Sequence, residues 1–303
     1  MSEIYKHLSK LYELTRNPKY ALDIAELCLT SNIKENLEYA LSIFKNLGDT
    51  YECSRKTFPE YFKEHMSQLL DKKIINFPIN SNVNLTVVIP TMWKASSNYF
   101  LHNIEALKKS KVVKKVIIID NNPQDNYLNI NDGFVEVVTN NKNVGVNPAW
   151  NQGLEKVDTK YYLLLNDDCL VSPQVIQASV AVLEDDNSVG IVNCFTKKVP
   201  IYEYKSDHEL LIEYANHLGV NPNGWFIMGH TKDYKPIPKE LVYFYGDNFI
   251  HYNAVKDKKR VVKVISHFIS HDVSTTVNNL DLYRRGLLDS EGEIYRGIIG
   301  VKK

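Results

Sequence analysis

The sequence is poor in the features that mark secreted, membrane-spanning and zinc-binding proteins. Its 303 residues include four scattered cysteines and no Cys-x-x-Cys pair, so neither a disulfide framework nor a zinc site is expected. No run approaches the roughly 20 apolar residues of a membrane-spanning helix. The first residues also lack the apolar core of a signal peptide. We therefore expect reduced thiols and a cytoplasmic location, which would be the host cytoplasm for a phage protein.

The chain has no excess of either charge and no dinucleotide-binding glycine motif. Lysine plus arginine and aspartate plus glutamate number 36 each, so no global attraction to nucleic acid or anionic membranes is expected. No Gly-x-Gly-x-x-Gly follows the apolar run that ends at Pro90-Thr91, which argues against a nicotinamide-binding enzyme. The composition, 44% hydrophobic and 24% charged, is that of a globular protein with a sizeable core.

The apolar pattern divides the chain into three parts. Residues 1–80 have helical periodicity and predict an N-terminal α-helical module. That module is either a packed extension or a docking element for a protein partner. Residues 85–275 alternate short apolar runs with amphipathic segments, and residues 276–303 form a C-terminal extension.

The middle part has the pattern of an α/β fold. Short apolar runs alternate with segments of helical periodicity, which predicts a doubly wound, mostly parallel sheet with helices on both faces. The strands are expected at 85–89, 116–119, 134–138, 161–165, 190–193, 224–229 and 260–265, and the helices at 98–109, from 147 and from 173.

Three oxygen-bearing side chains follow the most apolar of these strands. Asn166, Asp167 and Asp168 come directly after the run Tyr161–Leu165, where open α/β sheets bind their ligands. Adjacent carboxylates repel each other, and their oxygens suit Mg²⁺ or Mn²⁺ shared with a phosphate. The alternative is a polar turn before a helix that begins at Ser172-Pro173.

Six short motifs occur in a fixed order along residues 85–275. They are Val87-Val-Ile-Pro-Thr91, Val116-Ile-Ile-Ile-Asp120, Asn143-Val-Gly145 through Asn151 to Gly153, Asn166-Asp167-Asp168, Tyr245-Gly246-Asp247 and His271-Asp-Val-Ser-Thr-Thr276. Their order and spacing resemble those of the family 2 glycosyltransferases, which have the GT-A (Rossmann-like) fold.

The resemblance implies a role for each motif. It makes Asp168 the main ligand of a Mn²⁺ or Mg²⁺ ion, because Asn166 replaces the first acid of the family's Asp-x-Asp, and His271 a further ligand. It makes Asp247 the catalytic base and implies a UDP- or dTDP-sugar donor. The donor-binding residues would be Pro90, Thr91, Asp120, Asn143, Gly145, Asn151, Asn166 and Asp167.

Several of these residues also have purely structural interpretations. An aspartate after a strand often forms a turn, an asparagine in a loop often bonds the backbone, and a histidine or tryptophan on a strand often belongs to the core. These alternatives apply to Asp120 and Asp247, to Asn151, and to His271 and Trp225, with His267 as the rival of His271 for the functional role.

We therefore expect an inverting, metal-dependent glycosyltransferase, either a hexosyl- or a pentosyltransferase, that acts in surface glycan synthesis. One alternative is a phage-type enzyme that glycosylates hydroxymethylated cytosine in DNA, although zero net charge disfavours phosphate binding. A second alternative is a GT-A-like module that binds ligands without catalysis.

Overall fold

The computed structural model describes residues 52–53, 56–57, 73–76, 83–94, 97–127, 130, 132–196, 209–215, 224–271 and 282–300. The chain divides into two compact units, Met1–Lys72 and Lys73–Lys303. In the first unit, β1 (Glu52–Cys53) and β2 (Lys56–Thr57) form an antiparallel pair. The helices predicted for the N-terminal module lie outside the described residues.

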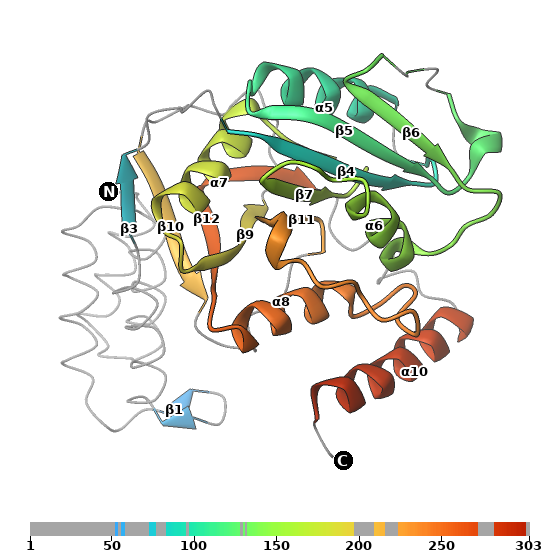
Figure 1. Cartoon of the computed structure of the whole chain (residues 1–303). Coiled ribbons are helices and arrows are strands. Elements are labelled where there is room, and N and C mark those ends of the chain that lie inside the picture. The colour runs from blue at the N-terminus through green and yellow to red at the C-terminus, as the bar shows by residue number, and fades with distance from the viewer. Residues whose placement is uncertain are drawn as a thin grey trace, which may run out of the picture. The chain divides into compact units, whose positions relative to one another are not determined.

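The second unit is built on one large sheet with the strand order β3-β10-β12-β9-β11-β7-β4-β5-β6, while β8 pairs with β12 (Figure 1). The predicted α/β fold class is confirmed. The run β6-β5-β4-β7 is parallel, and β11, β10, β8 and β3 pair antiparallel with their neighbours, so the complete sheet is mixed. The strands are β3 (Lys73–Asn76), β4 (Leu85–Thr91), β5 (Val113–Asp120), β6 (Val135–Thr139), β7 (Tyr161–Leu165), β8 (Cys169–Leu170), β9 (Val189–Thr196), β10 (Glu209–Ala215), β11 (Phe226–His230) and β12 (Arg260–His271).

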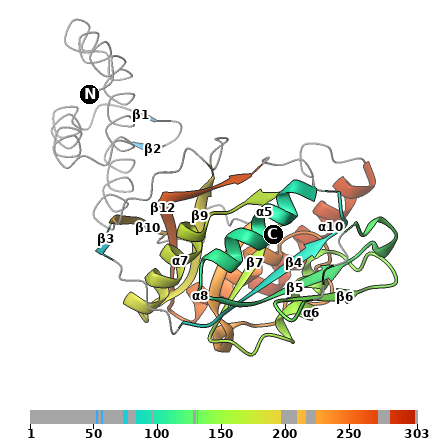
Figure 2. The ribbon, with the colours of Figure 1, turned by 90° about the horizontal axis from the view of Figure 1, so that it is seen from above.

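Helices cover both faces of the sheet because successive strand residues point to opposite sides. Val87 and Ile89 of β4 belong to one core with α5 (Ser97–Lys109) and α7 (Pro173–Asp185). Val88 belongs to the other core, with α6 (Val146–Leu154) and α8 (Gly246–Lys256). Figure 2 looks down on the α5 side, and α10 (Leu282–Ile299) lies on the α8 side. Among the described residues, no helix has the length and apolarity needed to cross a membrane.

The predicted start of α7 is confirmed in detail. Ser172 has an extended backbone, and its hydroxyl accepts a hydrogen bond from the backbone N–H of Val175 at 3.2 Å. Pro173 occupies the first helical position, where a missing N–H costs nothing. This cap fixes the direction of the chain just after the Asp167-Asp168 pair.

Strands β1, β2 and β3 lie within residues 1–80, where the sequence predicts helices. Three later elements also differ from the sequence prediction. Helix α8 begins at Gly246 and is not predicted by the sequence pattern, because its buried side chains Phe249 and Ile250 are too few to give a clear helical period. The turn considered as an alternative for Asp247 is instead the first turn of this helix. Strand β12 continues beyond 265 to His271. Strand β10 occupies a segment that looks polar and irregular, because it pairs with β12 on one side and β3 on the other, and that pairing depends on neighbours rather than composition.

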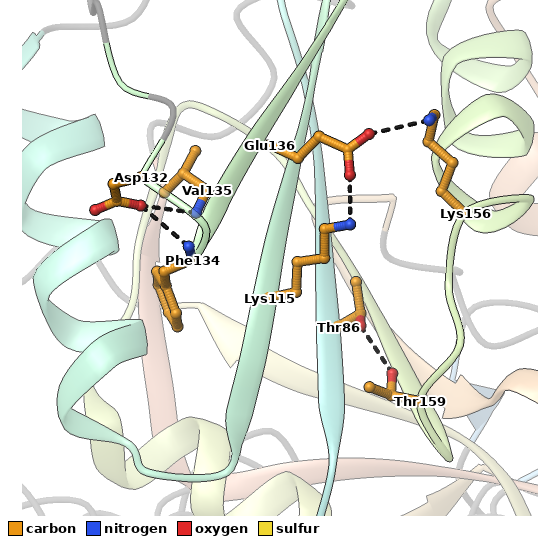
Figure 3. A network of polar contacts seen from close by, with 8 residues as sticks. All are labelled: Thr86, Lys115, Asp132, Phe134, Val135, Glu136, Lys156 and Thr159. Atoms are coloured by element: carbon orange, nitrogen blue, oxygen red, sulfur yellow. Dashed lines mark hydrogen bonds and ion pairs between the residues drawn. The ribbon is translucent and has the colours of Figure 1, made fainter.

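Charges mark the β6 edge of the sheet. Glu136 of β6 pairs with Lys115 of β5 and with Lys156, whose Nζ lies 3.0 Å from a Glu136 oxygen (Figure 3). Hydrogen bonds from both lysines, Lys115 first, hold the pKa of Glu136 below its ordinary value. Charged side chains on an edge strand discourage pairing with other chains. The charges around Glu136 should therefore keep β6 from pairing with a strand of another molecule.

Candidate active site

The carboxyl ends of β4 and β7 bring Thr91 beside Asp167. The Thr91 hydroxyl donates to Asp167 Oδ2 at 2.7 Å and accepts from the backbone N–H of Trp93 at 2.8 Å. Burial raises the pKa of Asp167 to about 6, the Thr91 hydrogen bond opposes this, and the adjacent Asp168 charge reinforces it. Pro90 and Thr91 pair with the last residues of β5, so the predicted donor-binding positions of these strands share one edge.

Asp120, at the end of β5, is fully buried and organises the turn that follows it. Its Oδ1 accepts from the indole N–H of Trp93 at 2.8 Å and from the backbone N–H of Asn122 at 3.0 Å, while Oδ2 accepts from Asn126 Nδ2 at 3.2 Å. The turn-forming role considered for Asp120 is therefore present. Trp93 was missed by the sequence analysis, and its positive φ of 58° marks a strained position of the kind that concentrates at functional sites.

A second cluster contains the predicted metal ligands. Strand β12 pairs His271 with Cys169 of β8, which brings His271 Nε2 to 3.3 Å from Asp168 Oδ1. One ligand atom each from Asp168, Cys169 and His271 lies within 4.8 Å of the others. A carboxylate and an imidazole are ligands that suit Mn²⁺, so these residues fit a divalent cation. His271 is buried and directed at Asp168, whereas the side chain of its rival His267 lies outside the described residues.

Asp247 lies in the first turn of α8. Its Oδ1 accepts from the backbone N–H of Asn248 at 2.9 Å, a position where the positive end of the helix dipole favours a carboxylate. Burial nevertheless raises the pKa of Asp247 to about 6. The other oxygen, Oδ2, faces Gly224, where an added Cβ would lie only 3.2 Å away.

The dipeptide Gly224-Trp225 connects this carboxylate to the Asp168 cluster. The Trp225 carbonyl accepts from the backbone N–H of Asn166 at 3.0 Å, and the indole ring stacks on His271 at a centroid distance of 5.0 Å. Trp225 is only partly buried, so it packs against the core and also borders the site. Because residue 224 is a glycine, no side chain approaches the Asp247 carboxylate from this position.

The segment from Asn143 to Gly153 makes hydrogen bonds and close contacts with backbone next to the site. Asn143 Oδ1 accepts from the N–H of Gly145, whose φ of 91° and contact with Val242 leave no room for a side chain. Asn151 donates to the Ile237 carbonyl at 2.9 Å, and its Oδ1 accepts from the Ile237 N–H and the Tyr234 hydroxyl. The structural role considered for Asn151 is therefore present.

A family model described as Glycosyl transferase family 2 matches residues 86–255, more than half of the chain. The chain belongs to glycosyl transferase family 2. The match includes every predicted site residue except His271, and it ends before β12 and α10.

Solved structures with similar folds are also glycosyltransferases. The crystal structure of GalNAc-T7 with UDP, GalNAc and Mn²⁺ is 15% identical and has a TM-score of 0.50, covering 63% of this chain. The mannosyltransferase PcManGT from Pyrobaculum calidifontis, in complex with GDP-Man and Mn²⁺, is 13% identical and has a TM-score of 0.50, covering 72%. This chain spans 44% of the GalNAc-T7 chain and 66% of PcManGT. Comparison with curated proteins finds no significant match.

The structure of this family 2 member brings most predicted residues together, but it also adds others. Thr91 contacts Asp167, and Asp168 contacts His271. Asn143 bonds the backbone of Gly145, which packs against Val242, and Asn151 bonds the backbone of Ile237. The sequence pattern does not single out Trp93, which donates to Asp120, or Glu291, which accepts from the backbone N–H groups of Val242 and Phe244. A single tryptophan or glutamate has no signature until its partners are known.

Proposed function

We propose that this glycosyltransferase is inverting and depends on a divalent metal, and that it moves a sugar from a nucleotide-sugar donor to an acceptor hydroxyl. The observation that carries the proposal is the arrangement of two carboxylate groups at one end of the sheet. Asp168 faces His271. Trp225 stacks on His271, and the neighbouring Gly224 lies against Asp247. In this arrangement Asp168 can act at the leaving group and Asp247 at the attacking hydroxyl.

Asp168 and His271 would hold the metal ion, and Asp167 would support them from its hydrogen bond with Thr91. A bound Mn²⁺ or Mg²⁺ would supply positive charge for the diphosphate leaving group. The Mn²⁺ named with both solved relatives supports this assignment. The half-buried position of Asp168 leaves it accessible to a donor phosphate.

Asp247 would accept the proton of the acceptor hydroxyl as that oxygen attacks. Its raised pKa of about 6 makes it a better base than an ordinary aspartate and still leaves it ionised at neutral pH. A single base with direct displacement gives inversion at the anomeric carbon. The absent side chain at Gly224 keeps Oδ2 from being covered.

The donor nucleoside would bind along Pro90, Thr91, Trp93 and Asp120, next to the metal ligands. UDP and GDP-Man, named with the two relatives, support a nucleotide-sugar donor. We propose a uridine or thymidine diphosphate sugar and an acceptor of glycan type. The predicted site residues would all lie within residues 85–275, and the N-terminal module would be either a packed extension or a docking element.

The donor site is tested by thermal unfolding with UDP, dTDP, GDP and CDP, each with and without Mn²⁺. A nucleotide at ~100 times its dissociation constant should stabilise the folded state by about 2.7 kcal/mol. The stabilisation should require the metal and disappear in Asp168→Asn, while the exposed control Asp158→Asn keeps it. A chain that no nucleotide stabilises would contradict the proposal and favour a module without catalytic activity.

The acceptor is tested separately with the donor identified in that way. Transfer to soluble glycan acceptors is compared with transfer to duplex DNA containing hydroxymethylcytosine, at two salt concentrations. A glycan-specific enzyme should label only the first. Salt-sensitive labelling of the duplex would instead establish the DNA-modifying alternative.

A further inference from the structure

We propose that helix α10, which lies beyond the family-matched segment, positions the catalytic base, and that Glu291 is its main positioning residue. The inference rests on the proposed role of Asp247. It concerns a strap of backbone, residues 241–245, that leads directly into Gly246-Asp247 at the start of α8. The strap has no regular secondary structure of its own, so other elements must hold it.

Glu291 holds the N–H groups of the strap. Its Oε2 accepts from the backbone N–H of Val242 at 3.0 Å, of Tyr243 at 3.1 Å and of Phe244 at 2.8 Å. Glu291 is only 3% exposed. Three successive N–H groups that converge on one oxygen form an anion-binding nest, and here the anion comes from the C-terminal helix.

Asn147 of α6 holds the carbonyl groups of the same strap. Its Nδ2 donates to the Leu241 carbonyl at 3.1 Å and to the Phe244 carbonyl at 3.0 Å, and its N–H donates to the Val242 carbonyl at 3.2 Å. The strap is thus clamped between α6 and α10, with donors on one side and an acceptor on the other. Removal of either partner would leave partly buried backbone groups without these hydrogen bonds.

Tyr245, the last residue of the strap, connects the clamped backbone to Gly246-Asp247. It has a left-handed backbone with φ of 61°, which is uncommon and costly for a residue other than glycine. Its ring stacks on Tyr295 of α10 at a centroid distance of 5.4 Å and an interplanar angle of 15°. Gly292 makes room for it, because an added Cβ there would lie 2.7 Å from the Tyr245 hydroxyl.

Helix α10 also contacts the first turn of α8. The Tyr295 hydroxyl donates to the carbonyl of Asn248, the residue after Asp247, at 3.3 Å. Helix α10 therefore fixes the strap, the strained residue and the helix turn that together aim Asp247. The Asp168 and His271 ligands take no part in these contacts, so donor binding should not depend on Glu291.

The test compares Glu291→Ala and Glu291→Gln in the full-length protein, with the exposed Glu293→Gln on the same helix as control. Mn²⁺-dependent hydrolysis of UDP-GalNAc, UDP-GlcNAc and GDP-mannose gives kcat and KM, with water as the acceptor. We expect kcat to fall about 10- to 100-fold in Glu291→Ala, because small misplacements of a catalytic group are costly. Glu291→Gln, which keeps one acceptor oxygen, should lose less, and KM should stay within about two-fold.

Two further measurements separate positioning from general stability. In an Asp247→Asn background, Glu291→Gln should cause no additional loss of kcat, because residues that act as a unit are not additive. Amide hydrogen exchange should accelerate in the peptide that contains 242–244 and remain unchanged in β7, which also shows that the variant is folded.

The outcomes distinguish this inference from the proposed function. A kcat for both Glu291 variants equal to that of Glu293→Gln would overturn the positioning role while leaving the glycosyltransferase assignment in place. An equal loss in the Asp247→Asn background would also overturn it, since the effect would then not pass through Asp247. A wild-type chain that hydrolyses no donor would overturn the proposed function and this inference with it.

Discussion

At Asp247, burial opposes ionisation, and this gives a prediction with a definite sign. Because the pKa rises to about 6 in the folded state, against about 3.9 for an ordinary aspartate, ionisation destabilises the fold progressively from pH ~4 to ~6. Above pH ~6 the cost is constant. Asp247→Asn should therefore raise Tm by an amount that grows over this pH window and then levels off.

The same substitution should lower transfer by about 10²- to 10⁴-fold at pH 8, the usual contribution of a general base. Thermal unfolding between pH 4 and 8 checks the first part, and initial rates check the second. A Tm gain that is the same at pH 4 and pH 8 would show that the pKa of Asp247 is not raised.

Asn151 gives a prediction of the opposite kind, a stability effect without a binding effect. Its amide makes three hydrogen bonds to Ile237 and Tyr234. Asn151→Ala leaves these partners unsatisfied and should lower the free energy of unfolding by about 1–3 kcal/mol.

The KM for the donor should be unchanged in Asn151→Ala, because these contacts lie in the support rather than in the donor site. Urea unfolding and steady-state kinetics provide the check, with Tyr234→Phe as a milder control that removes one bond. A large rise in KM with normal stability would instead indicate direct donor contact.

At the scale of elements, the packing of α6 on β4 depends on a missing side chain. A Cβ at Gly153 would lie 2.2 Å from Cγ1 of Val88. Gly153→Ala should therefore cost roughly 1–3 kcal/mol through overpacking. The double variant Gly153→Ala/Val88→Ala should recover part of that loss, because the clash is removed.

This prediction is checked by a double-mutant cycle in urea. Strictly additive effects of the two substitutions would show that the helix and strand do not meet at this point. The cycle matters for function because α6 carries Asn147, one side of the clamp on the strap before Asp247.

At the scale of the whole molecule, the position of a truncation should decide whether the catalytic unit survives. Strand β3 pairs with β10, so residues 73–76 belong to the sheet although the sequence pattern placed them before its boundary. A chain that begins at 73 should keep its Tm and its nucleotide binding.

A chain that begins at 85 should be less stable and should self-associate, because removal of β3 exposes the backbone of β10 as an open edge. Thermal unfolding and size-exclusion chromatography compare the two truncations with the intact chain. Equal Tm and equal elution of both truncations would mean that β3 contributes nothing to the sheet.

The sequence by itself determined the parts of this protein that depend on local pattern. The continuous apolar runs 116–119 and 161–165 located β5 and β7, because parallel strands buried on both faces are largely apolar. The Ser172-Pro173 cap located α7, since capping depends on a few adjacent residues. The order of the motifs also pointed to family 2.

Only the tertiary structure decided how distant residues meet. His271 comes next to Asp168 through the β8–β12 pairing. Glu291 bonds Phe244, in the strap before Asp247, across 47 residues of sequence. A lone histidine or glutamate carries no local signal for such contacts. Their roles depend on strand register and helix packing, which are properties of the whole fold rather than of any segment.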